Sequence, residues 1–455
     1  MPPSPGLWSG SMRRLFTLLA IMGLWVEALS ATSLSGSVGG LGATAARQGS
    51  RNVFWNPASI GPIDRTEFEI QAQLIGGWLT YDRQGDDRYS NTPHASSTAR
   101  TIAGAPSIFI ASSLGSSRFR FGYANYFPSG AMGKFSETGS QRYEFVEGLF
   151  VPWNHQLSLA YQINDQWSVG VSSIFSLAFI RLETDVDLTP FLSEFIEEDQ
   201  VLREHPAMSS RASIPLSSTL GFGGSFGVLY RPSVQWSLGA SLYLPIQYNF
   251  KTIIHSSSPT ALEAFGPAQA AVGMLDGIEN EGQVKMQSPL ALNVALRYQP
   301  FGYWTTEFFG RYLFSSMIRF ASVRFTDSSL LPLKGQEIPG LRPKDQWMIG
   351  SLQSFSFSRR LSFASRIDYQ SHNTPDHMLS ITRASFNSIG LGVLGRYRLS
   401  PNSVLGAEFA HSFAFRRKAT EAHSASELRL FQPPPTDGTY RSGVSRLGVS
   451  FHYEF

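Results

Sequence analysis

Apolar and polar residues alternate strictly at the C-terminal end of the chain. Leu447, Val449 and Phe451 belong to an apolar series that ends at Phe455, and polar or small residues stand between its members. Because successive side chains of a β-strand point to opposite faces, this period of two predicts a strand with one apolar and one polar face. A soluble sheet with one wet face gives the same pattern, so a single strand leaves the class of protein open.

The same alternation recurs along the chain and predicts fourteen strands, connected by segments that are sorted by length. The strands lie near 67–81, 101–114, 117–127, 155–164, 166–183, 218–230, 235–250, 289–299, 304–324, 346–357, 361–371, 387–398, 402–415 and 443–455. Short connections fall at 115–116, 165, 231–234, 300–303, 358–360 and 399–401, and long ones at 82–100, 128–154, 184–217, 251–288, 325–345, 372–386 and 416–442. Short and long connections alternate, as in outer-membrane barrels with short periplasmic turns and long external loops. We therefore predict an all-β fold, a 14-stranded antiparallel transmembrane β-barrel over 67–455 in the outer membrane of a Gram-negative-type envelope.

Three tryptophans stand at equivalent places near the beginnings of predicted strands. Trp167, Trp236 and Trp304 each follow a short connection closely. Aromatic girdles of membrane barrels lie at the interfaces, so we expect these side chains at the periplasmic edge. Ordinary core packing of a strand-start tryptophan is the alternative.

The N-terminus has the three regions of a secretory signal peptide. Arg13 and Arg14 precede an apolar run over 15–26, and small residues follow near position 30. A membrane-spanning helix needs about 20 apolar residues, and this run is shorter. We expect residues 1–30 to be a cleaved signal peptide, with Met12 as a possible alternative start.

The segment 31–66 carries no strand pattern. It is rich in glycine and contains the sequence Asn56-Pro57-Ala58. Because the interior of a barrel of this predicted size is too wide for its own side chains to fill, we predict that 31–66 folds into the lumen as a hatch.

Composition and motifs exclude several classes of function. Charged residues make up 16% of the chain and the net charge is only +3, which disfavours a nucleic-acid partner. There is no cysteine, no HExxH sequence and no nucleotide-binding glycine loop between a strand and a helix. His372 and His377 flank Asp376, but a solvated loop explains them better than a metal site. We expect no enzyme activity, no metal and no cofactor.

Two long connections contain helical patterns. Thr189 and Pro190 begin an amphipathic stretch with Phe191 and Phe195 on one face, and Leu262 and Phe265 lie in a similar stretch of 251–288. An apolar helix face outside the membrane needs a partner, which is either the other loop or a hydrophobic ligand.

Several short motifs occur in an order that resembles one known family. The motifs are Gly39-Gly40-Leu41-Gly42-Ala43 continuing to Arg51, then Asn56-Pro57-Ala58, Gly227-Val228-Leu229-Tyr230-Arg231-Pro232, Ser288-Pro289-Leu290 and the terminal Tyr453-Glu454-Phe455. Together they resemble the FadL family of outer-membrane transporters for long-chain fatty acids and other hydrophobic compounds. The resemblance covers most of 31–455.

The resemblance implies a mechanism and candidate site residues. Relatives bind ligand in a groove between the third and fourth external loops, pass it to an apolar lumenal pocket, and release it sideways through a gap in the wall after a hatch shift. Asn56, Pro57 and Ala58 match the hatch motif. By position, the candidates for the groove are Phe191, Phe195, Leu262 and Phe265. Arg311 and Arg319 are candidates to meet a carboxylate, with ordinary lumenal charge as the alternative.

The sequence thus predicts a monomeric, passive transporter of long-chain fatty acids or other hydrophobic small molecules, working with outer-membrane lipid. The alternative is a FadL-like barrel that serves a secretion system as a protein-interaction component or shuttle. A hydrophilic pore is disfavoured by the predicted hatch and by the few lumenal charges.

Overall fold

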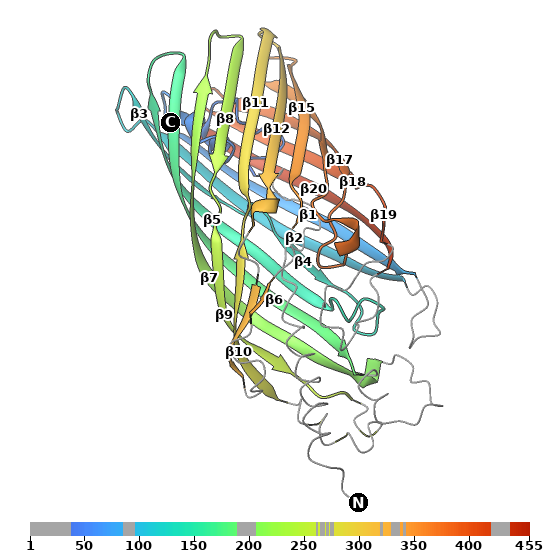
Figure 1. Ribbon diagram of the computed structural model, residues 1–455. Helices are drawn as coiled ribbons and strands as arrows, with labels where there is room; N and C mark the ends of the chain where they lie inside the picture. Colours follow the sequence, from blue (N-terminus) through green and yellow to red (C-terminus); the bar gives the residue numbers. More distant parts are fainter. Residues whose placement is uncertain are drawn as a thin grey trace, which may run out of the picture.

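The first and last strands of the computed structural model pair with each other and close the sheet into a barrel. β1 (Glu67–Arg83) and β20 (Gly438–Glu454) are antiparallel, with Ile70 opposite Phe451. The backbone N–H of Phe455 donates to the carbonyl of Thr66 at 2.9 Å, beyond the end of this ladder. The C-terminal strand therefore forms the seam of the barrel, which has no free edge here (Figure 1).

The structure describes residues 38–84, 96–188, 206–260, 277–318, 322–328, 337–339, 343–419 and 437–455, and the single residues 263, 269 and 273. The other strands in the described residues are β2 (Ser96–Ser112), β3 (Phe119–Tyr126), β4 (Ala131–Lys134), β5 (Glu147–Gln162), β6 (Trp167–Asp187), β7 (Ser209–Tyr230), β8 (Trp236–Tyr243), β9 (Gln247–Ser256), β10 (Ile278–Gln287), β11 (Leu290–Phe301), β12 (Trp304–Phe314), β13 (Ser322–Ser328), β14 (Glu337–Pro339), β15 (Gln346–Ser356), β16 (Leu361–Gln370), β17 (Ser388–Ser400), β18 (Ser403–Ala414) and β19 (Arg417–Ala419). The short 3-10 helices are η2 (Ser50–Phe54), η3 (Pro57–Ile60), η4 (Pro206–Met208), η6 (Ser315–Met317) and η8 (Asp376–Met378). Six barrel strands consist of two segments each, so the twenty described segments trace fourteen barrel strands and confirm the predicted fold class. Among these residues, no helix is long and apolar enough to cross a membrane.

The predicted strand bounds are too short at the end of the barrel with the long connections. The predicted loop 128–154 contains β4 and the beginning of β5, and the predicted loop 251–288 contains β10. The physical reason is that strands beyond the lipid no longer need one apolar face, so the alternation that marks them fades. The helical patterns near Phe191 and Leu262 lie outside the described residues.

Stacked aromatic pairs mark the end of the barrel with the short turns. Trp167 stacks on Tyr230 and Trp236 on Tyr298, each with ring centroids 4.2 Å apart. Trp304 lies parallel to Phe355 across the β12–β15 pair, at 6.2 Å. These pairs occupy the edge where the sequence predicts an aromatic girdle, and each joins two neighbouring strands.

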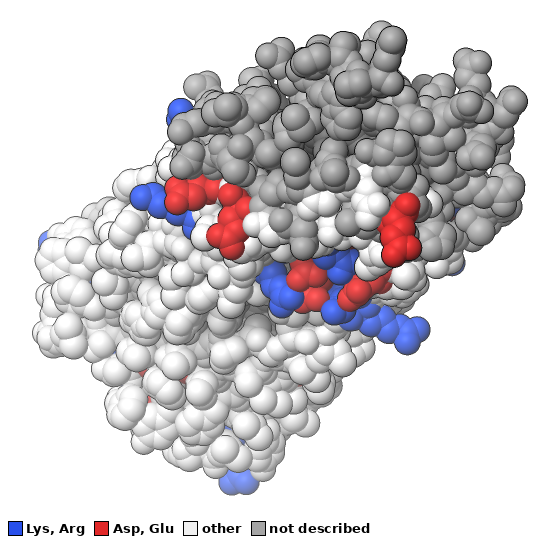
Figure 2. Space-filling view, turned by 90° about the horizontal axis from the view of Figure 1, so that it is seen from below, with Lys and Arg blue, Asp and Glu red and all other residues white. Residues whose placement is uncertain are grey.

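The outer face of the wall is apolar and its inner face is polar. On β6, Val169, Val171 and Phe175 are exposed, whereas Ser168 and Ser176, at the alternate positions of the strand, are buried toward the interior. Figure 2 shows a wall almost free of charged residues, with Lys, Arg, Asp and Glu gathered near the long connections. This distribution gives a belt of apolar side chains that faces lipid.

Residues 38–66 lie inside the barrel, behind β8 and β11 in Figure 1. Their two short helices, η2 and η3, pack against wall strands from β1 to β7. Phe54 and Ile60 are fully buried there, together with Tyr126 from β3 and Phe250 from β9. This inner segment, defined here as residues 38–66, therefore fills part of a lumen that wall side chains cannot fill alone.

Candidate functional site

Asn56 holds the middle of the inner segment. It is the N-cap of η3, and its side-chain oxygen accepts a hydrogen bond from the N–H of Ala58 at 2.9 Å. Its amide nitrogen donates to the carbonyls of Ala45 and Val228, each at 2.9 Å. Pro57 follows at the first helical position, where its missing N–H costs nothing. One buried side chain thus caps a helix, joins two parts of the inner segment and ties them to β7.

Glycines on the wall make room for this close contact. A Cβ at Gly227 would lie 2.0 Å from the Asn56 Oδ1, and one at Gly170 would lie 2.5 Å from the carbonyl carbon of Pro57. A Cβ at Gly239 would lie 1.8 Å from the carbonyl oxygen of Ala45. The inner segment therefore rests on a seat of three glycines from β6, β7 and β8, which the sequence analysis missed. Inward-facing glycine at alternating strand positions is the signal that marks such a seat.

Buried charges fasten the inner segment to other parts of the wall. Glu307 on β12 is fully buried, pairs with Arg47, and accepts a hydrogen bond from the Thr44 hydroxyl at 2.6 Å. Arg51 pairs with the buried Glu69 on β1. Removing one partner of a buried pair typically costs about 3–5 kcal/mol, because the other charge is left uncompensated. These pairs resist displacement of the inner segment as a whole.

Arg311 on β12 lies in the lumen against the aromatic rings of the inner segment. Its guanidinium carbon is 5.5 Å from the ring centroid of Phe54 and 5.7 Å from that of Trp55. Its Nε and Nη1 are buried and have no hydrogen-bond partner among the described residues. A buried guanidinium with free N–H groups can donate hydrogen bonds to a carboxylate.

The structure brings four of the predicted site residues together. Asn56, Pro57 and Ala58 follow Trp55 directly, and Arg311 contacts the Trp55 ring. The remaining candidates lie outside the described residues, namely Phe191, Phe195, Leu262, Phe265 and Arg319.

The wall is interrupted between β3 and β4. β3 ends at Tyr126, and Pro128, which has no N–H to donate to a ladder, stands in the break before β4. In the described part of the chain, β2 forms a ladder with β3 only over five residue pairs, from Ile108 to Ser112. Farther out, the Thr101 hydroxyl donates to the carbonyl of Met132 at 3.0 Å.

A small cavity of about 150 Å³ opens at this interruption, which we call the wall gap. Its lining includes Ala105, Phe127, Gly130, Ala131 and Met132. The Phe127 ring packs on one side against Ile75, Ala105 and Val444, which face the interior. On its other side the ring is parallel to Trp153 at 6.1 Å. Phe127 therefore stands between the lumen and the outer face of the wall.

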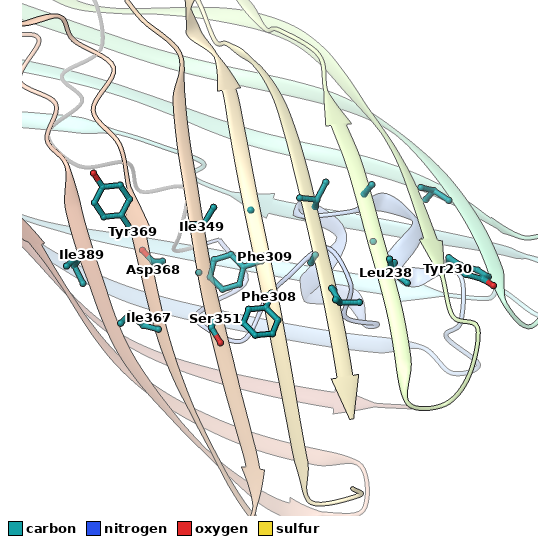
Figure 3. Close-up of a pocket in the computed structure, with 18 of the residues that line it drawn as sticks. Tyr230, Leu238, Phe308, Phe309, Ile349, Ser351, Ile367, Asp368, Tyr369 and Ile389 are labelled. Atoms are coloured by element: carbon teal, nitrogen blue, oxygen red, sulfur yellow. The ribbon is translucent and has the colours of Figure 1, made fainter. Parts of the chain in front are cut away.

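A second apolar hollow, of about 990 Å³, lies on the outer face across β8, β11, β12, β15 and β16. Figure 3 shows Leu238, Phe308, Ile349 and Ile367 around it, with the inner segment behind the strands. These four side chains are exposed on the lipid side, and the strands beneath them are continuously paired. The hollow is therefore a groove on the outer surface of an intact wall, in contrast to the wall gap.

Two external connections touch through Glu144. This residue lies between β4 and β5, and its carboxylate accepts the backbone N–H of Ile381, between β16 and β17, at 2.8 Å. Burial raises the pKa of the Glu144 carboxyl to about 7, against the opposing effects of that hydrogen bond and of Arg383 and Arg83. Burial of this carboxyl between the two connections is therefore sensitive to pH near neutrality.

His372, Asp376 and His377 lie in the same connection, between β16 and β17, and the sequence predicts that they do not form a metal site. His372 hydrogen-bonds Asn387 through Nδ1 at 2.7 Å, and Asp376 pairs with Arg417. No group of three or more potential ligands for a metal ion is found within the described residues.

The closed wall, its apolar outer belt and the filled lumen define an outer-membrane β-barrel. The chain belongs to the outer membrane protein transport protein family (OMPP1/FadL/TodX), whose model matches residues 20–455. This assignment confirms the resemblance found in the sequence.

Solved structures agree in fold. A FadL homologue from Pseudomonas aeruginosa aligns with a TM-score of 0.75 at 16% identity, covering 92% of this chain and 98% of that one. The toluene transporter TodX from P. putida aligns with a TM-score of 0.66 at 15% identity, covering 94% and 99%. The toluene transporter TbuX from Ralstonia pickettii aligns with a TM-score of 0.60 at 15% identity, covering 94% and 99%. No curated protein sequence matches the chain.

Replacement of Asn56 by alanine is expected to loosen the inner segment. The variant leaves the buried carbonyls of Ala45 and Val228 without their donor, at a cost of about 1–3 kcal/mol. We expect a higher ion conductance of the purified barrel in planar bilayers. Ser59→Ala is the matched control, because Ser59 is equally buried and its hydroxyl has no hydrogen-bond partner in the described structure. Equal conductances for Asn56→Ala and wild type would contradict the anchoring role.

The packing of the two connections around Glu144 is expected to loosen as pH rises through about 7, because the buried carboxyl becomes charged. Folding raises the pKa of this carboxyl above its ordinary 4.5, so its stabilisation is complete below that value and is lost as the pH exceeds the folded pKa. Spin labels at Thr138→Cys and His377→Cys report the separation of the two connections, because the chain has no other cysteine. We expect a broader distance distribution at pH 8.5 than at pH 5.5, and none of this change in Glu144→Gln. A pH-independent distribution in the Glu144 protein would count against the contact.

Proposed function

We propose that this protein is a passive transporter that takes hydrophobic compounds from outside the cell and releases them sideways into the outer membrane. The observation that carries this proposal is the wall gap. It combines a broken strand, an apolar lining and a single ring, Phe127, that touches both interior-facing residues and the outer-face Trp153. An apolar ligand that follows this path avoids the aqueous periplasm and needs no energy source.

Within this proposal the inner segment is the hatch. It fills the lumen and is fastened to the wall by Asn56 and by buried ion pairs. Residues 1–30 act as the signal peptide that directs the chain to export. We expect the barrel to work as a monomer, because its closed sheet leaves no strand edge for a second copy to pair with, and to need no cofactor or catalytic group.

The lumen favours long-chain fatty acids among the hydrophobic candidates. Arg311 offers free guanidinium donors beside the rings of Phe54 and Trp55. An acyl chain packs on such rings while its carboxylate pairs with the guanidinium. The solved toluene transporters show that the same fold serves neutral aromatic compounds, so Arg311 is the feature that separates the two substrate classes here.

Filling the wall gap is expected to stop uptake. Ala131→Trp places a large side chain in a cavity of about 150 Å³, and Ala240→Trp adds the same side chain to the separate outer groove. We expect uptake of labelled oleate by a deletion strain to require the gene, to be lost with Ala131→Trp and to be kept with Ala240→Trp. Heat-modifiable migration checks that each barrel is folded. Equal uptake with and without the gene would sink the transport proposal, and full uptake by folded Ala131→Trp would sink the sideways route.

Removal of the lumenal charge is expected to weaken the binding of fatty acids selectively. Arg311→Met keeps a long apolar side chain but removes the donors. A hydrogen bond between charged groups contributes about 1.5–3 kcal/mol, so we expect affinity for oleate to fall at least tenfold. Affinity for toluene should remain unchanged, which serves as the control. Isothermal titration of the detergent-solubilised protein measures both, and an unchanged affinity for oleate would show that Arg311 is ordinary lumenal charge.

A further inference from the structure

Three polar side chains form a hydrogen-bonded cluster on the lipid-facing side of the wall. Tyr123 and Asn125 come from β3, and His155 comes from the neighbouring β5. The Tyr123 hydroxyl lies 2.9 Å from His155 Nδ1, and the Asn125 amide nitrogen lies 3.2 Å from the same atom. We call these three residues the outer polar cluster.

The strand alternation places this cluster on the outer face. Ala124, between Tyr123 and Asn125, and Gln156, next to His155, are fully buried toward the interior. The next residues on the same face are apolar and exposed, with Phe121 45% and Leu157 53% accessible. The three cluster residues are themselves only partly buried. They therefore interrupt an otherwise apolar surface that faces lipid.

The depth of the cluster makes its polarity costly. On β5, His155 stands between Tyr161, which hydrogen-bonds Arg118 near a short turn, and Glu147, which pairs with Arg181 at the opposite rim. The apolar band of such barrels is about 25 Å tall, so a position between the two rims lies far from either polar interface. Polar side chains at this depth are rare and mark functional sites. The headgroups of membrane lipids stay at the interfaces, so they do not explain polar side chains at this depth.

The cluster adjoins the wall gap through one side chain. The Trp153 ring centroid lies 4.7 Å from that of His155 and 6.1 Å from that of Phe127. The Trp153 Nε1 is buried and has no hydrogen-bond partner in the described part of the molecule. A free donor thus belongs to a ring that contacts both Phe127 and the imidazole of the cluster.

We propose that the outer polar cluster and Trp153 form an exit subsite for the polar head of an amphiphilic substrate. The inference rests on the sideways release proposed above and extends it to substrate class. A fatty acid that passes Phe127 would have to bring its carboxyl group into hydrocarbon, where an unpaired polar group is strongly unfavourable. Tyr123, Asn125, His155 and the Trp153 N–H offer that group hydrogen bonds while its acyl chain enters the membrane. A neutral hydrocarbon has no use for this subsite.

The test compares two substrates in one variant. Tyr123→Phe/Asn125→Leu/His155→Leu removes the polar atoms and keeps apolar bulk on the lipid face. We expect uptake of labelled oleate at low concentration to fall about tenfold, as expected for the loss of a hydrogen bond to a charged group, and uptake of labelled toluene to stay at the wild-type rate. Unchanged oleate uptake would overturn the subsite. An equal fall for both substrates would also overturn it, because it would indicate a structural role.

A second measurement is independent of the folding of the triple variant. A fatty acid that carries a photoreactive diazirine next to its carboxyl group is expected to label β3 or β5 near Trp153 in the wild-type barrel. The same group placed at the methyl end of the chain should label this region less. Equal labelling by both probes would overturn the subsite. If the wild-type gene supports no uptake of either substrate, the transport proposal fails instead, so the two failures are distinguishable.

Discussion

The rest of the structure depends on one constraint: in the membrane, every backbone N–H and C=O must find a partner within the protein. A sheet meets this demand only if it closes, and here the closure is the ladder between β1 and β20. Closing so many strands leaves an interior too wide for wall side chains to fill. The inner segment fills it, but its own irregular backbone then needs partners. Asn56 and Gln156 supply two of them, by donating to the carbonyls of Ala45 and Val53.

The same constraint explains why an opening in the wall is unusual and informative. Between β3 and β4 the ladder stops, and a proline and a glycine occupy the break. The backbone groups freed there lie beside a cavity lined by apolar side chains. A barrel gains no stability from such a break, which weakens pairing next to lipid. A break at this place, with Phe127 fitted into it, is the feature on which the proposed sideways path rests.

The fold could be predicted from the sequence because each lipid-facing strand needs an apolar residue at every second position, and this pattern is local. The seam strand around Phe451 and the girdle tryptophans follow from that pattern. Contacts between segments that are distant in sequence cannot be predicted from this local pattern. Nothing local connects Gly239 with Ala45, or Arg311 with Trp55, since these pairs meet only after the barrel has closed. At Pro128 the sequence predicts the end of a strand, because it does not show that pairing resumes at Ala131.

The sizes of the opposing interactions decide between an axial and a sideways route. Expelling the inner segment toward the periplasm would break the Arg47–Glu307 and Arg51–Glu69 pairs, at about 3–5 kcal/mol for each buried pair disrupted, as well as the bonds of Asn56. Turning Phe127 away from Trp153 gives up one aromatic contact, about 0.5–1.5 kcal/mol beyond its buried area. The bound ligand can replace that area with its own apolar surface, but it cannot replace the buried ion pairs. These magnitudes favour the sideways route that we propose, in which the inner segment stays fastened while the ligand passes Phe127.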